Sequence, residues 1–163
     1  MYQISNGTYT MHIGPAGTGY SSWRDIALSR WTDDPVEDNA GFFIYLRDLA
    51  NGERWSLGHQ PLRQTAERYR VHGTKGRFLL ERHDRGIESR LMATVVPTAD
   101  VEIRRITLRN DSDHPRRLEV TGYLEVVLAS AAADAAHPAF AKLFVETEAI
   151  PEQAILLATR RPR

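Results

Sequence analysis

Residues 77–96 read RFLLERHDRGIESRLMATVV, and this stretch decides the fold class of the chain. Phe78 and Leu80 fall on one face of an extended segment and Leu79 falls on the other, which is the period of a β-strand. Residues 84–86, Asp-Arg-Gly, then mark a turn, and a second apolar run returns from Ile87. The stretch therefore predicts two antiparallel strands joined by a tight turn.

Similar strand patterns recur on both sides of this hairpin, with polar turns between them. Such spacing, with few helix signals, is typical of an antiparallel sandwich. We therefore predict an all-β antiparallel β-sandwich with little helix, in which Ser130–Ala136 forms at most one helical turn because His137-Pro138 stops it. The other expected strands are Tyr9–Ile13, Phe42–Arg47, Arg54–Leu57, Val101–Leu108, Leu118–Leu128, Lys142–Glu146 and Ala154–Thr159.

Composition excludes several classes of function. The 163 residues suit a single domain, and 21 basic residues balance 21 acidic ones, so nucleic acid is not expected as a partner. The chain has no cysteine, which suits a reducing compartment, and its histidines show no metal-ligand spacing, so we expect neither metal nor cofactor. No apolar run approaches the about 18 residues of a membrane span, and direct membrane insertion is not expected.

Residues 14–31, GPAGTGYSSWRDIALSRW, predict a binding loop, because they are too polar for a core strand and too aromatic for a linker. Their glycine spacing is similar to that of a phosphate-binding loop, but Tyr20 stands where that motif needs lysine. No helix pattern follows, which argues against a nucleotide site.

Aromatic residues in and near this loop offer a different chemistry. Trp23, Trp31, Trp55 and Tyr20 could present flat apolar faces to a sugar ring. The alternative is packing in the core, because tryptophan is usually well buried. The sequence favours core packing more strongly for Trp31 and Trp55 than for Tyr20 and Trp23.

Five carboxylates, Asp25, Asp33, Asp34, Glu37 and Asp38, raise the possibility of a glycosidase. Hydrolysis of a glycosidic bond needs two carboxyl groups at a fixed separation, for example Asp25 with Asp33 or Asp34. A solvated acidic surface explains them more simply, and we assign no catalytic residue.

A series of short motifs, in this order, resembles the N-terminal domain of glycoside hydrolase family 94. The likeness includes the family 94 portion of cyclic β-1,2-glucan synthases, once grouped as glycosyltransferase family 36. The motifs are Asn6-Gly7-x-Tyr9, Gly17-x-Gly19-Tyr20-Ser21-x-Trp23-Arg24-Asp25, Arg30-Trp31, Tyr45-Leu46-Arg47-Asp48, Trp55-Ser56-x-Gly58-x-Gln60-Pro61, Tyr123-x-Glu125-x-Val127-Leu128 and Asp134-x-Ala136-His137-Pro138-Ala139-Phe140-x-Lys142-x-Phe144.

The resemblance implies a β-sandwich like that of the galactose mutarotase superfamily, followed in the family by a helical linker and an (α/α)6 barrel that carries the catalytic acid. Residues 1–163 would then be a single non-catalytic domain, a fragment of a larger glycosyltransferase or glycoside phosphorylase that acts on β-glucan. Its implied partners are that barrel, a β-glucan oligosaccharide and a second copy in a homodimer. Its implied place is the cytoplasmic face, with the parent enzyme anchored in the bacterial inner membrane.

The resemblance also suggests a site, in which the loop Gly17–Asp25 reaches the rim of a sugar-binding cleft. Tyr20 and Trp23 would stack on sugar rings, and Arg47 and Asp48 would hold the loop in shape. An alternative function is an independent carbohydrate-binding module that grips β-glucan through this aromatic loop. The expected substrate-binding residues are Tyr20, Ser21, Trp23, Arg24 and Asp25.

Overall fold

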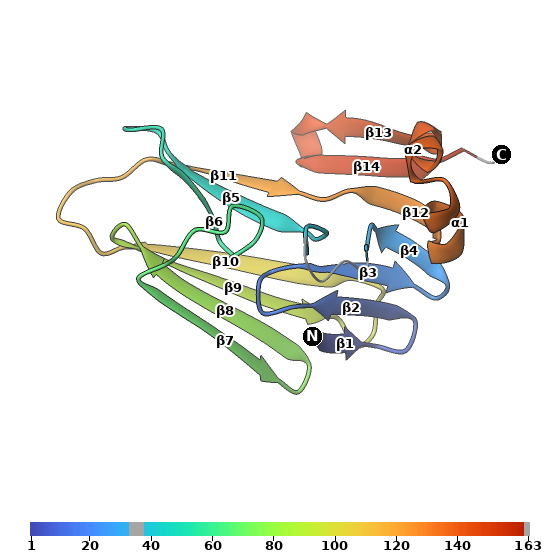
Figure 1. Cartoon of the computed structure of the whole chain (residues 1–163), viewed down its shortest axis with the longest axis horizontal. Coiled ribbons are helices and arrows are strands. Elements are labelled where there is room, and N and C mark those ends of the chain that lie inside the picture. Colours follow the sequence, from blue (N-terminus) through green and yellow to red (C-terminus); the bar gives the residue numbers. More distant parts are fainter. Residues whose placement is uncertain (33–37, 162–163) are drawn as a thin grey trace.

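The computed structural model describes residues 1–32 and 38–161, and these residues form antiparallel sheets with little helix (Figure 1). This confirms the predicted all-β fold. The strands are β1 (Tyr2–Ser5), β2 (Tyr9–Ile13), β3 (Gly19–Trp23), β4 (Ile26–Ser29), β5 (Phe43–Asp48), β6 (Arg54–Ser56), β7 (Arg68–Thr74), β8 (Arg77–Asp84), β9 (Ile87–Val95), β10 (Glu102–Asn110), β11 (Leu118–Tyr123), β12 (Val126–Ser130), β13 (Val145–Ile150) and β14 (Ile155–Arg160).

The strands form four sheets, each antiparallel throughout. The five-stranded sheet has the order β1-β2-β3-β4-β12, and the four-stranded sheet has the order β10-β9-β8-β7. A three-stranded sheet, β11-β5-β6, and the hairpin β13-β14 complete the fold. Figure 1 shows β13 and β14 as a separate hairpin beside β12.

The main core lies between the five-stranded and four-stranded sheets. Met11 of β2 packs in one cluster with Phe78 and Leu80 of β8, and all three are 0% exposed. The alternation of β8 explains this, because every second side chain points to the same side. Burying a side chain of this size contributes about 1.5–3 kcal/mol, so these positions hold the two sheets together.

A smaller cluster joins the three-stranded sheet to the end of the four-stranded one. Leu46 of β5, Trp55 of β6 and Ile87 of β9 are all buried in it. Trp55 is 0% exposed, which confirms core packing as its role.

A buried ion pair extends the core face of β8. Arg82, whose side chain is 1% exposed, donates a hydrogen bond of 2.7 Å to Asp84. It also donates to the backbone oxygens of Gly58, at 3.1 Å, and Gln64, at 3.3 Å. The guanidinium group thereby fixes the segment that follows β6.

In the part of the chain that the structure describes, helical structure is confined to short segments. The helix α1 (Ala131–Ala136) begins after Ser130, whose Oγ accepts a hydrogen bond of 3.3 Å from the backbone N–H of Ala133. It ends before Pro138, as predicted. Three further turns are α2 (Pro138–Ala141), η1 (Lys142–Phe144) and η2 (Pro151–Gln153). Among the described residues, no helix has the length and apolar character needed to cross a membrane.

Two predicted elements differ from the structure. The strand expected over Leu118–Leu128 is two strands, β11 and β12, in different sheets. The chain changes sheets near Glu125, whose backbone oxygen accepts a bond from Arg30, and Leu128 has a positive φ of 54°. The strand expected from Lys142 begins only at Val145, because residues 142–144 form η1.

Candidate functional site

The segment Gly14–Trp31 is not a single loop, and this part of the prediction was wrong. It contains β3 and β4, which pair with each other, and β3 also pairs with β2. Gly19 permits the close approach of β3 to β2, because a Cβ there would lie 2.0 Å from the backbone oxygen of His12. Hydrogen bonds between strands therefore pair the backbone of a polar segment, although its hydrophobic pattern alone predicts a loop.

The strand conformation sends the two predicted stacking residues to opposite faces. Successive side chains alternate along β3, so Tyr20 and Trp23, three positions apart, cannot share a face. Ser21 lies on the same face as Trp23. The predicted substrate-binding residues of β3 thus divide into an outer group, with Tyr20, and an inner group, with Ser21 and Trp23.

The outer group is an aromatic row. The Tyr20 ring stacks on His12 of β2, with ring centroids 4.5 Å apart and an interplanar angle of 12°. It also contacts Trp31, at 5.3 Å and a tilt of 36°. Burial lowers the pKa of His12, which favours the uncharged imidazole. We call these three residues, His12, Tyr20 and Trp31, the aromatic row.

The inner group ties the hairpin to the four-stranded sheet. Ser21, only 7% exposed, donates a hydrogen bond of 2.5 Å to Glu102 of β10. The indole N–H of Trp23 donates to Asp100 at 2.6 Å. The hydroxyl of Thr8, and after it the indole of Trp23, hold the pKa of Asp100 below its usual value. The contacts of both predicted residues are therefore structural ones.

Glu102 is the centre of a polar cluster that sequence analysis missed. It accepts hydrogen bonds from Ser21, from the Tyr9 hydroxyl at 3.1 Å and from Arg104. Burial, and after it the nearby charge of Glu102, raises the pKa of Tyr9 to about 12. The sequence showed the strand alternation of β10, but it did not show that β10 would lie close to β3, which carries Ser21.

Arg24 and Asp25 form the turn between β3 and β4, and both are exposed. Arg24 has a φ of 53°, and its guanidinium lies 4.5 Å from the centre of the Trp23 ring. The carboxylate of Asp25 is the acidic group at this tip of the hairpin. Both side chains are therefore accessible to solvent at the tip of this hairpin.

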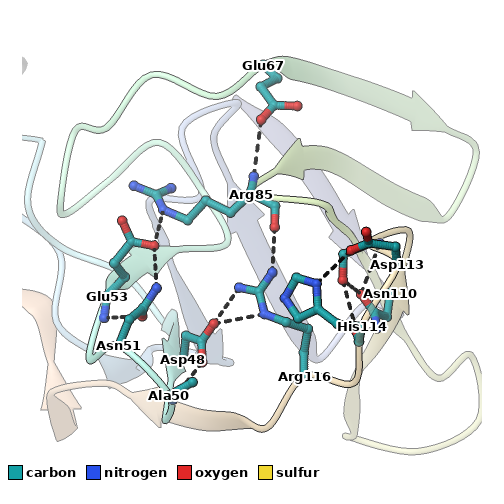
Figure 2. Close-up of polar contacts among 11 residues, drawn as sticks. Asp48, Ala50, Asn51, Glu53, Glu67, Arg85, Asn110, Asp113, His114 and Arg116 are labelled. Carbon is teal, nitrogen blue, oxygen red and sulfur yellow. Dashed lines mark hydrogen bonds and ion pairs between the residues drawn. The ribbon is translucent and has the colours of Figure 1, made fainter.

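The contacts of Asp48 lie elsewhere than expected. Asp48 accepts hydrogen bonds from Arg116, at 2.8 and 2.5 Å, and from the backbone N–H of Ala50, at 2.8 Å (Figure 2). The Ala50 N–H, and after it Arg116, hold the pKa of Asp48 below its usual value. Arg116 also donates to the backbone oxygen of Arg85 at 2.9 Å. Asp48 therefore fixes the turn after β5 against the segment before β11.

The contacts of Arg47 also differ from those expected. Arg47 projects from β5 beside Arg54 of β6 and Glu119 of β11. The support predicted for Gly17–Asp25 is instead provided by Asp100 and Glu102, through their bonds to Trp23 and Ser21.

The carboxylate pairs considered for a glycosidase, Asp25 with Asp33 or Asp34, cannot be placed in the structure. Asp33, Asp34 and Glu37 lie outside the described residues. Within residues 1–32 and 38–161, no group of three or more histidine and carboxylate side chains could hold a metal ion.

The comparisons with known proteins agree on one family. A family model described as "Glycosyl hydrolase 94, supersandwich domain" matches residues 2–163. The chain is 37% identical over 162 residues to the cyclic beta-(1,2)-glucan synthase NdvB of Rhizobium meliloti (strain 1021). It is 29% identical over 123 residues to an N,N'-diacetylchitobiose phosphorylase of Vibrio furnissii, and 33% identical over 86 residues to a solabiose phosphorylase of Paenibacillus borealis.

These relatives are much longer than the chain. The match covers 98% of this chain but 6% of the glucan synthase. It covers 71% of the chain and 15% of the chitobiose phosphorylase, and 53% of the chain and 11% of the solabiose phosphorylase. All three relatives are enzymes by name, and the matching region is a small part of each. The chain therefore belongs to the supersandwich domain family of glycosyl hydrolase family 94.

Proposed function

We propose that this domain is a non-catalytic carbohydrate-associated module of a larger family 94 enzyme, in which it shapes the sugar-binding cleft. The observation that carries the proposal is the aromatic row on the outer face of β2 and β3. A pyranose ring has an apolar C–H face, and flat aromatic rings are the side chains that match it. The row combines such faces with polar edges, from the Tyr20 hydroxyl and the His12 nitrogens.

The exposed turn between β3 and β4 extends this surface. Arg24 and Asp25 offer a donor and an acceptor to sugar hydroxyls. Trp23 does not belong to the proposed surface, because its indole N–H is bonded to Asp100. That bond also weighs against the alternative, an independent binding module that grips glucan through Tyr20 and Trp23 together.

We infer a β-glucan oligosaccharide as the ligand, because a relative that matches 98% of this chain is named a cyclic beta-(1,2)-glucan synthase. The catalytic groups would come from another domain, an (α/α)6 barrel, as the family resemblance implies. Fixed sandwich strands suit a supporting role, since a rigid scaffold places a recognition surface at little cost in entropy.

The proposal includes association with a second copy of the chain. Leu143, Leu156 and Phe140, at 67%, 83% and 52% exposure, supply apolar surface near the hairpin β13-β14. Exposed apolar patches commonly mark contact surfaces. The absence of cysteine suits the proposed location at the cytoplasmic face.

Replacing Tyr20 tests the sugar-binding part of the proposal. We expect Tyr20→Ala to weaken the binding of β-1,2-linked gluco-oligosaccharides about tenfold, which corresponds to about 1.4 kcal/mol. The measurement is calorimetric titration, with circular dichroism to show that the variant is folded. Trp23→Phe is the matched control, because it changes an aromatic residue of the same strand on the opposite face. Equal affinities for Tyr20→Ala and the unaltered protein, or a loss confined to Trp23→Phe, would refute the proposed surface.

A further inference from the structure

The outer face of the four-stranded sheet carries a surplus of positive charge that the functions above do not use. Val71 of β7 and Ile106 of β10 pack against the main core, so strand alternation turns their neighbours Arg70 and Arg105 outward. The same alternation applies to β8 and β9. We call the outward arginines of these four strands the basic face: Arg68, Arg70, Arg77, Arg90, Arg105 and Arg109.

Two carboxylates share this face with the arginines. Glu81 approaches Arg90 to 3.7 Å, and Glu88 pairs with Arg109 at 2.5 Å. The remaining charge is not neutralised in this way. The arginines of the basic face that form no ion pair with the described residues include Arg70, Arg77 and Arg105.

The surplus is concentrated towards the turn between β7 and β8. At the other end of the strands, Asp111 also pairs with Arg109, at 2.7 Å. At the turn end, Lys75, Arg77 and Arg105 line a groove of about 750 Å³, and the described residues that line it include no carboxylate. An anion that approaches the domain from this side therefore meets three cations together.

The charge of the chain is thus unevenly distributed, although it sums to zero. The chain has 21 basic and 21 acidic residues, yet the basic face holds six arginines and two glutamates. An equal acidic surplus must lie elsewhere on the chain. An anionic surface would therefore orient the domain with the basic face towards it.

The basic face is broad, and aliphatic side chains lie between its cations. Neighbouring strands are about 4.8 Å apart, so Arg70 on β7 and Arg105 on β10 lie about 14 Å apart across the sheet. Figure 1 shows these four strands side by side in one layer. Register places Leu79 and Met92 in one row with Arg105, and Ile103, 43% exposed, lies in the adjacent row. Cations attract anionic lipid headgroups, and aliphatic side chains favour the headgroup boundary.

Other anionic partners fit this face less well. The outward side chains of β7–β10 include no phenylalanine, tyrosine or tryptophan, on which the bases of single-stranded nucleic acid stack. Duplex DNA is read by elements that enter a groove about 12 Å wide, and a four-stranded sheet face is broader than this. An acidic protein would need carboxylates in a fixed arrangement, whereas lipid headgroups rearrange around dispersed cations.

We propose that the basic face binds the anionic surface of a lipid membrane. Its guanidinium groups form paired hydrogen bonds with lipid phosphates, and Met92 and Ile103 contact the headgroup boundary. This inference deepens the location proposed above, and it rests on that proposal for the identity of the membrane. It does not involve the aromatic row, whose His12 and Tyr20 belong to the five-stranded sheet.

The test is co-sedimentation with phosphatidylcholine vesicles that contain about one third phosphatidylglycerol, at low ionic strength. Replacing Arg70, Arg77 and Arg105 together by glutamine should lower the partition coefficient about 100-fold, or about fivefold for each arginine. The matched control replaces three exposed arginines on other elements and makes the same change in net charge, and it should bind almost as the unaltered protein does. Its substitutions are Arg54→Gln, Arg63→Gln and Arg117→Gln.

A second measurement locates the contact directly. The chain has no cysteine, so one introduced cysteine can carry a polarity-sensitive dye. The emission of the dye on Ile103→Cys should shift to the blue when anionic vesicles are added. Leu49→Cys is the control, because Leu49 has nearly the same exposure, 44%, in the turn after β5, and its dye should not respond.

Several results would overturn the inference. They are equal binding to vesicles of phosphatidylcholine alone, equal losses in the two triple variants, a dye response at Leu49→Cys and not at Ile103→Cys, or no vesicle binding at low ionic strength. Retention on DNA or on polyglutamate without vesicle binding would assign the basic face to another partner and refute the inference. Tyr20→Ala should bind vesicles as the unaltered protein does, so failure here is distinguishable from failure of the proposed sugar-binding surface.

Discussion

Replacing Arg82 by methionine should destabilise the domain far more than the charged residues around it in the sequence suggest. The Arg82 side chain is 1% exposed and donates to Asp84 and to two backbone oxygens, those of Gly58 and Gln64. Removing one partner of a buried ion pair typically costs about 3–5 kcal/mol. Asp84 keeps a second ion pair with Arg85, at 2.6 Å, so we expect the lower end, about 3 kcal/mol.

The neighbouring strand provides the matched control. Arg90 of β9 is 55% exposed, and its nearest carboxylate oxygen, from Glu81, is 3.7 Å away. Exposed pairs contribute about 0–1 kcal/mol, so Arg90→Met should lie within that range. The two variants make the same chemical change on adjacent strands and differ in the burial and the hydrogen bonds of the arginine that is removed.

The assay is urea unfolding followed by circular dichroism, with linear extrapolation to water. A loss of about 3 kcal/mol should also lower the melting temperature by about 6–12 °C for a domain of this size. If Arg82→Met unfolds with the same free energy as Arg90→Met, the argument that Arg82 fixes the segment after β6 is wrong.

Three further predictions concern side chains that form hydrogen bonds within the domain. Trp23→Phe should lower the melting temperature without changing saccharide affinity, since it removes the bond to Asp100 and leaves the aromatic row intact; reduced affinity would contradict this. Asp48 has a lowered pKa, so its stabilising effect is present above its unfolded pKa of about 4 and is lost as the pH falls through its lower folded value. The difference in unfolding free energy between Asp48→Asn and the unaltered protein should therefore shrink in acid, and a constant difference would contradict it. Tyr9 should titrate at about 12 in ultraviolet absorbance, and Tyr9→Phe should remove that step. Because the folded pKa is raised, the effect of Tyr9 on stability is constant below pH 10 and declines as the pH rises towards 12.

Local patterning was sufficient to predict the fold class and several elements. Alternation over residues 77–96 predicted β8 and β9, and the pairing of Leu80 with Leu91 confirms the antiparallel register. The Asn51-Gly52 turn between β5 and β6 was also predicted, and Gly52 has the positive φ, 76°, that such a turn needs. These features depend on residues close in sequence, so their signals are contained in short windows.

The candidate site was only partly predictable, because its contacts join distant residues. The sequence correctly marked Gly14–Trp31 as unusual, but it did not reveal that sheet bonds with β2 would make part of it a strand. That pairing separates Tyr20 from Trp23. The bond between Trp23 and Asp100 spans 77 positions, and no local pattern records it.

Strand periodicity, turn residues and ordered motifs are local properties, and they were enough to predict an antiparallel β fold and a family. The folded structure was needed to show which polar side chains hold the sheets together and which remain accessible, because a hydrogen bond between distant residues forms only where their strands become neighbours. Arg82 and Gly58 illustrate this, because they are 24 positions apart and are joined by a hydrogen bond only where β8 lies beside the segment after β6.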